Sequence, residues 1–143
     1  NEGARMKQDV LSRLAKIEEW VGVVETRSPQ VVEDYRKRLY DKMCEVLSSS
    51  NIDENRILLE AGIFSEKTAV DEETVRLRSH IAQFRSMLES GEPVGRKLDF
   101  LVQEMNRETN TIGSKVQDIE VTRIVVDQKS EIEKIREQIQ NIE

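Results

Sequence analysis

The sequence predicts an all-α protein, and two observations lead to this prediction. Of the 143 residues, 35% are charged and only 4% are aromatic, with six glycines and two prolines. This composition is typical of long helices rather than of a β-sandwich or barrel. Apolar residues also recur at steps of three and four along most of the chain, which is the spacing of one buried stripe on a helix. We therefore expect antiparallel helical hairpins and a bundle with long coiled-coil-like helices.

Residues 1–50 are predicted to form a helical hairpin. From about residue 4 to residue 25, apolar side chains form a near-heptad seam of Met6, Val10, Leu14, Ile17, Val21 and Val24. Ser28 and Pro29 then have the pattern of a helix start, with Ser as the N-cap and Pro at the first helical position. A second helix would run to about Ser48. Because the link is very short, the two helices would pack antiparallel over residues 4–48.

Residues 51–143 are predicted to form a helical bundle. Asp53 is a candidate cap for a helix through about Lys67, and the acidic residues at 71–73 suit the start of a helix that ends near Ser90. The segment 95–115 follows, with an apolar stripe of Leu98, Leu101, Val102, Met105 and Ile112. A last helix begins near Asp118. Gln128 is the one polar position in its apolar seam, and such a residue often fixes register.

Charge and cysteine content exclude several classes of protein. The formal net charge of −6 argues against a generic electrostatic nucleic-acid binder, although a local basic groove remains open. The single cysteine cannot form an internal disulfide, and no apolar run approaches the 18 residues of a membrane span. We expect a cytoplasmic protein that does not enter a membrane. The chain opens at Asn1 in what is already helical sequence, so we also expect it to be a piece of a longer protein.

The segment 95–115 carries an unusual polar surface. Glu104 and Glu108 lie one turn apart, and paired carboxylates can hold a magnesium or manganese ion. The same spacing is also common on solvated helices, and this simpler interpretation is favoured by the pattern alone. A second polar stripe consists of Asp99, Gln103, Asn106 and Asn110. Amides gain nothing from helix propensity, so these side chains either bind nucleotides or satisfy one another across a subunit interface.

Two other sets of residues are candidates for phosphate chemistry. His80, the only histidine, is placed at the edge of the apolar face of its helix, one turn after Arg76. An imidazole there could transfer protons, but a lone border histidine is more often a packing residue. A strip of Arg96, Lys97, Arg107 and Lys115 could grip phosphates. Ion pairing of these cations with Glu104, Glu108 and Asp118 is the competing interpretation.

Several stretches together resemble the C-terminal half of the YicC/YloC family of bacterial proteins. The strongest likeness is in GEPVGRKLDFLVQEMNRETNTIGSK and the following VVDQKSEIEKIREQIQNIE, within residues 91–143. RLRSHIAQF, residues 76–84, and the opening EGARMKQDVLSRL also match that family's pattern. Residues 26–70 match loosely, and EAGIFSEKTAVDEE departs from it.

The resemblance implies a function that periodicity and spacing do not show. It implies an endoribonuclease that depends on a divalent metal cation (manganese or magnesium) and assembles as a ring-like hexamer around RNA. The chain would be about half of the full-length protein, without its N-terminal domain. With this family in view, Glu104 and Glu108 become metal ligands and His80 becomes the proton-transfer residue. Further roles follow for two groups: phosphate contacts by Arg76, Arg78, Lys97 and Arg107, and orientation of the carboxylates or the RNA by Gln103, Asn106 and Asn110.

The sequence therefore supports two hypotheses of different classes. In the first, this chain is the C-terminal domain of a metal-dependent endoribonuclease and carries its catalytic residues. In the second, it is a helical oligomerisation module of an RNA-binding protein, and catalysis lies elsewhere. The first requires that the polar sides of two neighbouring helices converge, so that imidazole, carboxylates and guanidinium share one hollow.

Overall fold

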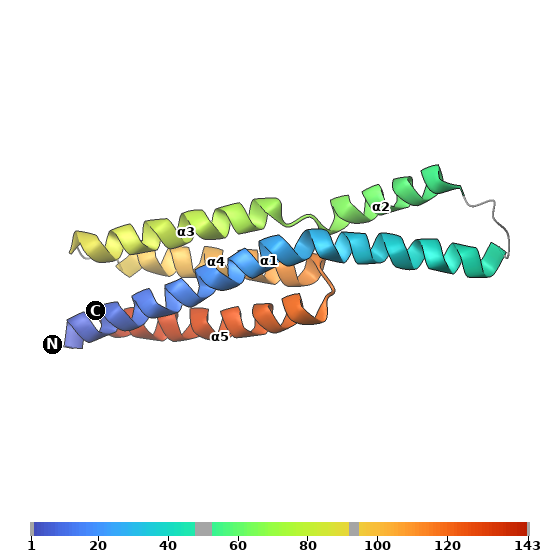
Figure 1. Ribbon diagram of the computed structural model, residues 1–143. Coiled ribbons are helices and arrows are strands. Elements are labelled where there is room, and N and C mark those ends of the chain that lie inside the picture. Colours follow the sequence, from blue (N-terminus) through green and yellow to red (C-terminus); the bar gives the residue numbers. More distant parts are fainter. Residues whose placement is uncertain (1, 48–52, 92–94, 143) are drawn as a thin grey trace.

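The computed structural model describes residues 2–47, 53–91 and 95–142, and these form five helices without a strand. The helices are α1 (Glu2–Leu47), α2 (Glu54–Thr68), α3 (Asp71–Ser90), α4 (Gly95–Lys115) and α5 (Ile119–Ile142). The all-α prediction is confirmed. At 1.5 Å per residue, the 46 residues of α1 span about 70 Å, and α1 runs the whole length of the molecule (Figure 1).

The first half of α1 and helices α3, α4 and α5 form an antiparallel four-helix bundle (Figure 1). In this bundle α1 and α4 each pack against both α3 and α5. The expected stripes supply the core, because Val10, Leu14, Ile17 and Val21 of α1 are fully buried. All five apolar residues expected to face inward from α4 are buried as well. Toward its C-terminal end α1 leaves the bundle and packs against α2, where Tyr35 and Phe64 stack with ring centroids 3.9 Å apart (Figure 1).

Helix boundaries follow the expected caps except at one place. The side chain of Asp53 accepts a hydrogen bond from the backbone N–H of Arg56 and so caps α2, and Gly91 ends α3 in the left-handed conformation with φ 71°. Gly113 stays within α4, where its Cα faces Val125 of α5. Gln128 is buried and donates a hydrogen bond to Thr109 Oγ1 of α4 at 3.0 Å.

The predicted helical hairpin within residues 1–50 is wrong, because α1 continues through Ser28 and Pro29 as one helix. Ser28 does not cap a new helix; its hydroxyl donates back to the carbonyl oxygen of Val24 at 2.8 Å. Val24 and Val31, seven residues apart, are both buried, so the apolar face is continuous across the proline. Packing on both sides therefore overrides a local signal that is typical of a helix start. The partner that folds back on residues 31–47 is α2.

Replacing Pro29 with Ala tests this continuity. Proline has no N–H to donate to the carbonyl of Glu25, and inside a helix it costs about 3 kcal/mol relative to Ala. We expect Pro29→Ala to raise the free energy of unfolding by up to roughly that amount, measured by urea denaturation. The exposed neighbour Gln30→Ala is the control and should change stability little. A Pro29→Ala variant that is less stable than the parent would instead favour a helix start at Ser28.

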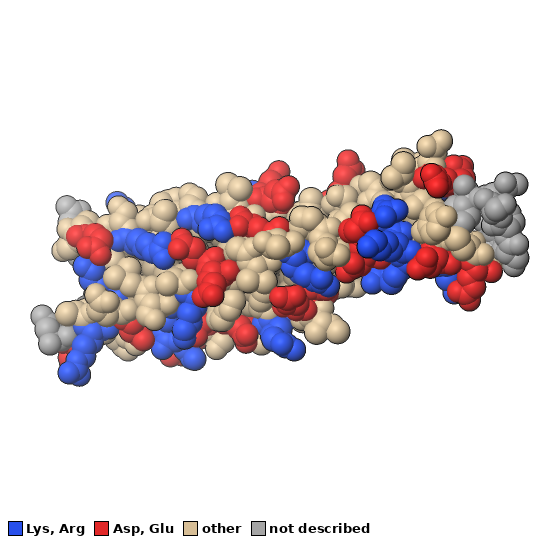
Figure 2. Space-filling view, viewed as in Figure 1, with Lys and Arg blue, Asp and Glu red and all other residues tan. Residues whose placement is uncertain are grey.

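Ion pairs tie α1 to its neighbours on both sides. Glu18 pairs with Arg85 of α3 at 2.8 Å, and Arg13 pairs with Glu131 of α5 at 2.6 Å. Arg27 reaches Asp118 in the turn before α5, with its Nη2 2.9 Å from Oδ1. On the face shown in Figure 2, basic and acidic side chains are accordingly interspersed rather than separated into patches of one sign. No described helix combines the length and the apolar character that a bilayer span requires.

These pairs predict a loss of stability in acid. Hydrogen bonds from Arg27 lower the pKa of Asp118, and hydrogen bonds from Arg85 and Arg78 lower the pKa values of Glu18 and Glu25. A carboxylate whose pKa is lowered on folding stabilises the fold above its unfolded-state pKa, and this contribution is lost as the pH falls through the folded value. We expect the urea midpoint to be steady above about pH 5 and to fall below about pH 4.

The Asp118→Asn variant isolates the charge at that site. Asn keeps an oxygen that can accept the hydrogen bond from the backbone N–H of Val121, now 3.2 Å from Asp118 Oδ2, but it cannot titrate. Its urea midpoint should therefore change less between pH 7 and pH 3 than that of the parent. The exposed Asp127→Asn is the matched control and should keep the parent's pH dependence. Equal acid sensitivity of Asp118→Asn and the parent would contradict the assignment.

Candidate active site

Helices α3 and α4 run antiparallel, and three pairs of polar side chains face one another along their contact. We call this row the α3–α4 seam. Lys115 Nζ lies 2.6 Å from Glu73 Oε1 at one end, and Arg76 Nε lies 3.0 Å from Glu108 Oε2 one turn further along α3. The next pair is His80 with Glu104. The seam arises because Glu73, Arg76 and His80 are three and four residues apart, which places them on one side of α3.

His80, Glu104 and Glu108 form a compact group, which we call the His80 cluster. One ring nitrogen of His80 and one oxygen of each carboxylate all lie within 4.8 Å of one another. Both His80 nitrogens are buried and have no hydrogen-bond partner. A buried imidazole normally satisfies at least one nitrogen. The structure thus brings together the imidazole and the two carboxylates that the sequence proposed, although their chemical roles stay predictions.

Arg76 holds the buried side of the cluster. The Glu108 side chain is only 5% exposed, and a carboxylate in such a place requires a charged or hydrogen-bonding partner. The hydrogen bond to Glu108 raises the pKa of Arg76, with desolvation opposing it. Arg76 therefore stays positive and keeps Glu108 oriented toward the seam.

The donor atoms of the His80 cluster fit a divalent cation. Carboxylate oxygens suit magnesium and manganese, whereas an imidazole nitrogen is taken more readily by transition-metal ions. A set of two carboxylates and one imidazole therefore suits manganese better than magnesium. The unpartnered nitrogens of His80 are the observation that favours such a ligand, because they leave an unused lone pair beside two anionic groups.

Other residues with predicted roles lie away from the cluster. Arg78 is on the opposite side of α3 from Arg76 and pairs with Glu25 of α1, with Nε 3.0 Å from Oε2. The amide stripe lies on another side of α4 from Glu104, because Asn106 and Asn110 are rotated by roughly 200° and 240° from it. Gln103 donates a hydrogen bond to Asp99 at 3.1 Å. No described hydrogen bond joins these amides to the carboxylates of the cluster, and their predicted role in orienting the RNA stays a prediction.

The basic strip divides into paired and unpaired residues. Lys115 is held by Glu73, for which the sequence pattern predicted only a place at the start of a helix. Glu73 shares one side of α3 with Arg76 and His80, and this spacing could have pointed to it. Arg96, Lys97 and Arg107 are exposed on α4, and no described residue forms an ion pair with them. The competing prediction, pairing with Glu104, Glu108 or Asp118, is therefore wrong for these three cations.

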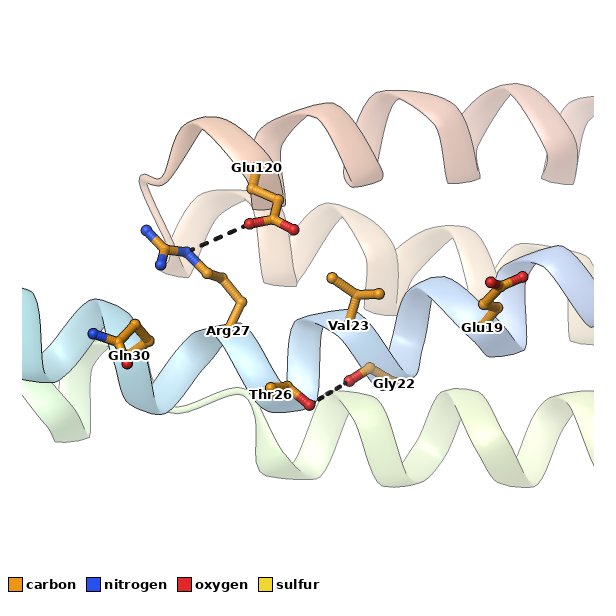
Figure 3. Close-up of a pocket in the computed structure, with 7 residues that line it drawn as sticks. All are labelled: Glu19, Gly22, Val23, Thr26, Arg27, Gln30 and Glu120. Carbon is orange, nitrogen blue, oxygen red and sulfur yellow. Dashed lines mark hydrogen bonds and ion pairs between the residues drawn. The ribbon is translucent and has the colours of Figure 1, made fainter.

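A hollow of about 510 Å³ lies elsewhere, along α1 (Figure 3). Glu19, Gly22, Val23, Thr26 and Gln30 line it on α1, together with Arg27 and Glu120. Two of its charged groups already pair with each other, since Arg27 Nε lies 3.8 Å from Glu120 Oε2, and Thr26 donates a hydrogen bond to the carbonyl of Gly22. It contains neither histidine nor an unpartnered buried group. The chemistry is thus better placed at the α3–α4 seam.

Comparison with known proteins agrees with the likeness seen in the sequence. The family described as "Endoribonuclease YicC-like, C-terminal" matches residues 24–143. The chain belongs to this family. The YicC-like match includes all of α2, α3, α4 and α5, and so the whole α3–α4 seam.

Two curated relatives carry the same family name. A protein of Clostridioides difficile (strain 630) named "Probable endoribonuclease YicC" is 49% identical over 143 residues. A protein of Haemophilus influenzae (strain ATCC 51907 / DSM 11121 / KW20 / Rd) with the same name is 36% identical over 142 residues. Each alignment covers 99% of this YicC-like chain and 49% of the relative. The chain thus spans about half the length of the curated relatives it matches.

Proposed function

We propose that this chain carries catalytic residues of a divalent-metal-dependent endoribonuclease. Family membership and the relatives' names support the reaction class. The single observation that supports the site is the pair of unpartnered His80 nitrogens beside Glu104 and Glu108. RNA is the proposed substrate, and assembly of the full-length protein as a homo-hexamer is part of the same proposal.

Residues of the α3–α4 seam and two exposed cations of α4 have different proposed roles in phosphodiester hydrolysis. Glu104 and Glu108 would hold the cation, which when bound would supply charge neutralisation at the phosphate and activation of the attacking water. His80 transfers a proton, because imidazole changes its charge near neutral pH. Arg76 keeps Glu108 in place, and Lys97 and Arg107 bind phosphates of the RNA backbone. Arg is suited to this because its guanidinium can hold two phosphate oxygens at once.

Removal of the metal is the simplest test of the proposed metal dependence. Full-length protein incubated with labelled RNA should cut it in the presence of manganese and leave it intact in EDTA. Activity should return when manganese is added back in excess of the chelator, and this recovery separates metal dependence from unfolding. Cleavage that proceeds unchanged in EDTA would contradict a metal-dependent mechanism. RNA that stays intact but bound under every condition would support passive binding alone.

A second candidate function is supported by apolar side chains outside the bundle. Leu58, Leu59 and Ile63 of α2 are 61%, 59% and 41% exposed, and Val46 of α1 is 67% exposed. A group of this kind is typical of a surface that meets another chain. The chain would then be an oligomerisation module of an RNA-binding protein. Glu104→Gln separates the alternatives, since loss of cleavage with unchanged assembly supports catalysis here, and loss of assembly supports the module.

A further inference from the structure

Phe100 differs from the other aromatic residues of the chain by its exposure. Phe84 is fully buried, Phe64 stacks on Tyr35, and Trp20 packs against the core. Tyr40 is 37% exposed, whereas Phe100, in the second turn of α4, is 59% exposed. A single exposed apolar residue is ordinary by itself. Phe100 is notable because it lies beside the His80 cluster, the proposed active site.

Phe100 lies one turn before Glu104 on α4. Residues four apart on a helix are surface neighbours, so the ring is placed beside the outer edge of the cluster. Arg96 and Lys97 precede Phe100 by four and three residues, and Arg107 follows it by two turns on nearly the same line. All three cations are exposed, and none forms an ion pair with a described residue. The ring is therefore flanked by free positive charge.

An aromatic face among free cations fits single-stranded nucleic acid. Proteins bind such strands with positive side chains that follow the phosphates and with aromatic rings on which bases stack. An apolar subunit contact at Phe100 would instead desolvate three cations that form no ion pair with a described residue. RNA supplies both the anionic backbone and the π face.

We propose that Phe100 is a stacking platform for an unpaired base of the RNA, next to the phosphate held at the His80 cluster. The inference rests on the proposed function in taking RNA as the substrate. The inference narrows the proposed substrate to RNA with unpaired bases. A base within a duplex is already stacked on its neighbours and cannot lie on Phe100. Phe100 is thus a positioning residue that favours single-stranded or looped RNA over a continuous duplex.

The test measures RNA binding by the full-length protein in EDTA, where binding is read independently of cleavage. We expect Phe100→Ala to weaken binding of a single-stranded RNA by about 5–150-fold and to leave duplex binding unchanged. Phe100→Trp should bind as tightly as the parent, and Phe100→Leu, which is apolar but cannot stack, should resemble Ala. Val126→Ala, at a position that is 61% exposed on α5, is the control and should bind normally.

RNAs with a base removed at one position complete the test without depending on the variant's assembly. One such position should weaken binding to the parent protein and have no further effect on Phe100→Ala. If no abasic position weakens the parent, or if Phe100→Ala binds single strands normally, the stacking proposal is wrong while the nuclease proposal stands on its cleavage assay. If the parent binds no RNA at all in EDTA, the stacking proposal also fails, whereas the nuclease proposal is still decided by cleavage in manganese.

Discussion

His80→Ala in the full-length protein is expected to lower the rate of RNA cleavage by about 10²–10⁴-fold, the usual contribution of a positioned acid or base. The fold should survive, because both His80 nitrogens are without partners and their removal breaks no hydrogen bond. Cleavage of a labelled RNA in manganese gives the rate, and light scattering gives the size of the assembly. Ser79→Ala, the exposed residue immediately before His80, is the control and should cut normally.

Glu104→Gln should remove activity to a similar extent while conserving side-chain shape. The amide is a weaker cation ligand than the carboxylate, so this variant should also need more manganese to reach half of its remaining activity. His80→Ala distinguishes two uses of the imidazole. If His80 only transfers a proton, the manganese requirement of the variant is unchanged; if the imidazole is a third ligand, the requirement rises. Normal cleavage by either variant would remove that residue from the site.

Lys115→Met is expected to destabilise the protein by roughly 2–3 kcal/mol, below the usual range for breaking a buried ion pair. Glu73 is only 2% exposed and its Oε2 atom already lacks a partner. Without Lys115, the nearest remaining cation is Arg76, whose Nη2 lies 3.9 Å from Glu73 Oε1. The Lys115 side chain is 35% exposed, which moderates the effect because water screens the pair.

A double-mutant cycle tests the cause of this loss. The double variant Glu73→Gln/Lys115→Met removes the buried charge together with its partner. It should therefore be more stable than the single variant Lys115→Met. Urea denaturation at pH 7 gives the four free energies of unfolding, those of the parent, Glu73→Gln, Lys115→Met and the double variant. Lys129→Met, an exposed lysine of α5, should change stability by less than about 0.5 kcal/mol. A double variant no more stable than Lys115→Met would show that the pair does not carry the stability of this end of the seam.

Much of the fold could be predicted because the helices of the bundle are strongly amphipathic. The stripe on residues 95–115, the cap at Asp53 and the helix end near Ser90 are local features, and the structure has them where the sequence predicts them. The helix that continues through Pro29 could not be predicted from the local sequence. A Ser-Pro pair has the same pattern at a helix start and within a long helix, and the outcome depends on whether α2 and the bundle hold both halves of α1 in line.

The site could be predicted only in part. The sequence separated two polar stripes on α4, but either flank of an apolar stripe can face the neighbouring helix. Only the packing shows that Glu104 and Glu108 face α3 while the amide stripe faces elsewhere. Helical angles do show that Arg76 and Arg78 cannot lie on the same side of α3, because they are about 200° apart around the helix axis. The approach of His80 to Glu104 depends on the register of α3 against α4, and residue spacing within one helix cannot set that.

The most direct test of the central claim is anomalous diffraction from manganese in crystals of the full-length protein. The claim is that His80, Glu104 and Glu108 surround one cation site at the α3–α4 seam. We predict a manganese peak between the two carboxylates and beside the His80 ring. Manganese bound only elsewhere, with His80 and Glu104 facing different sides of the assembled protein, would contradict the account.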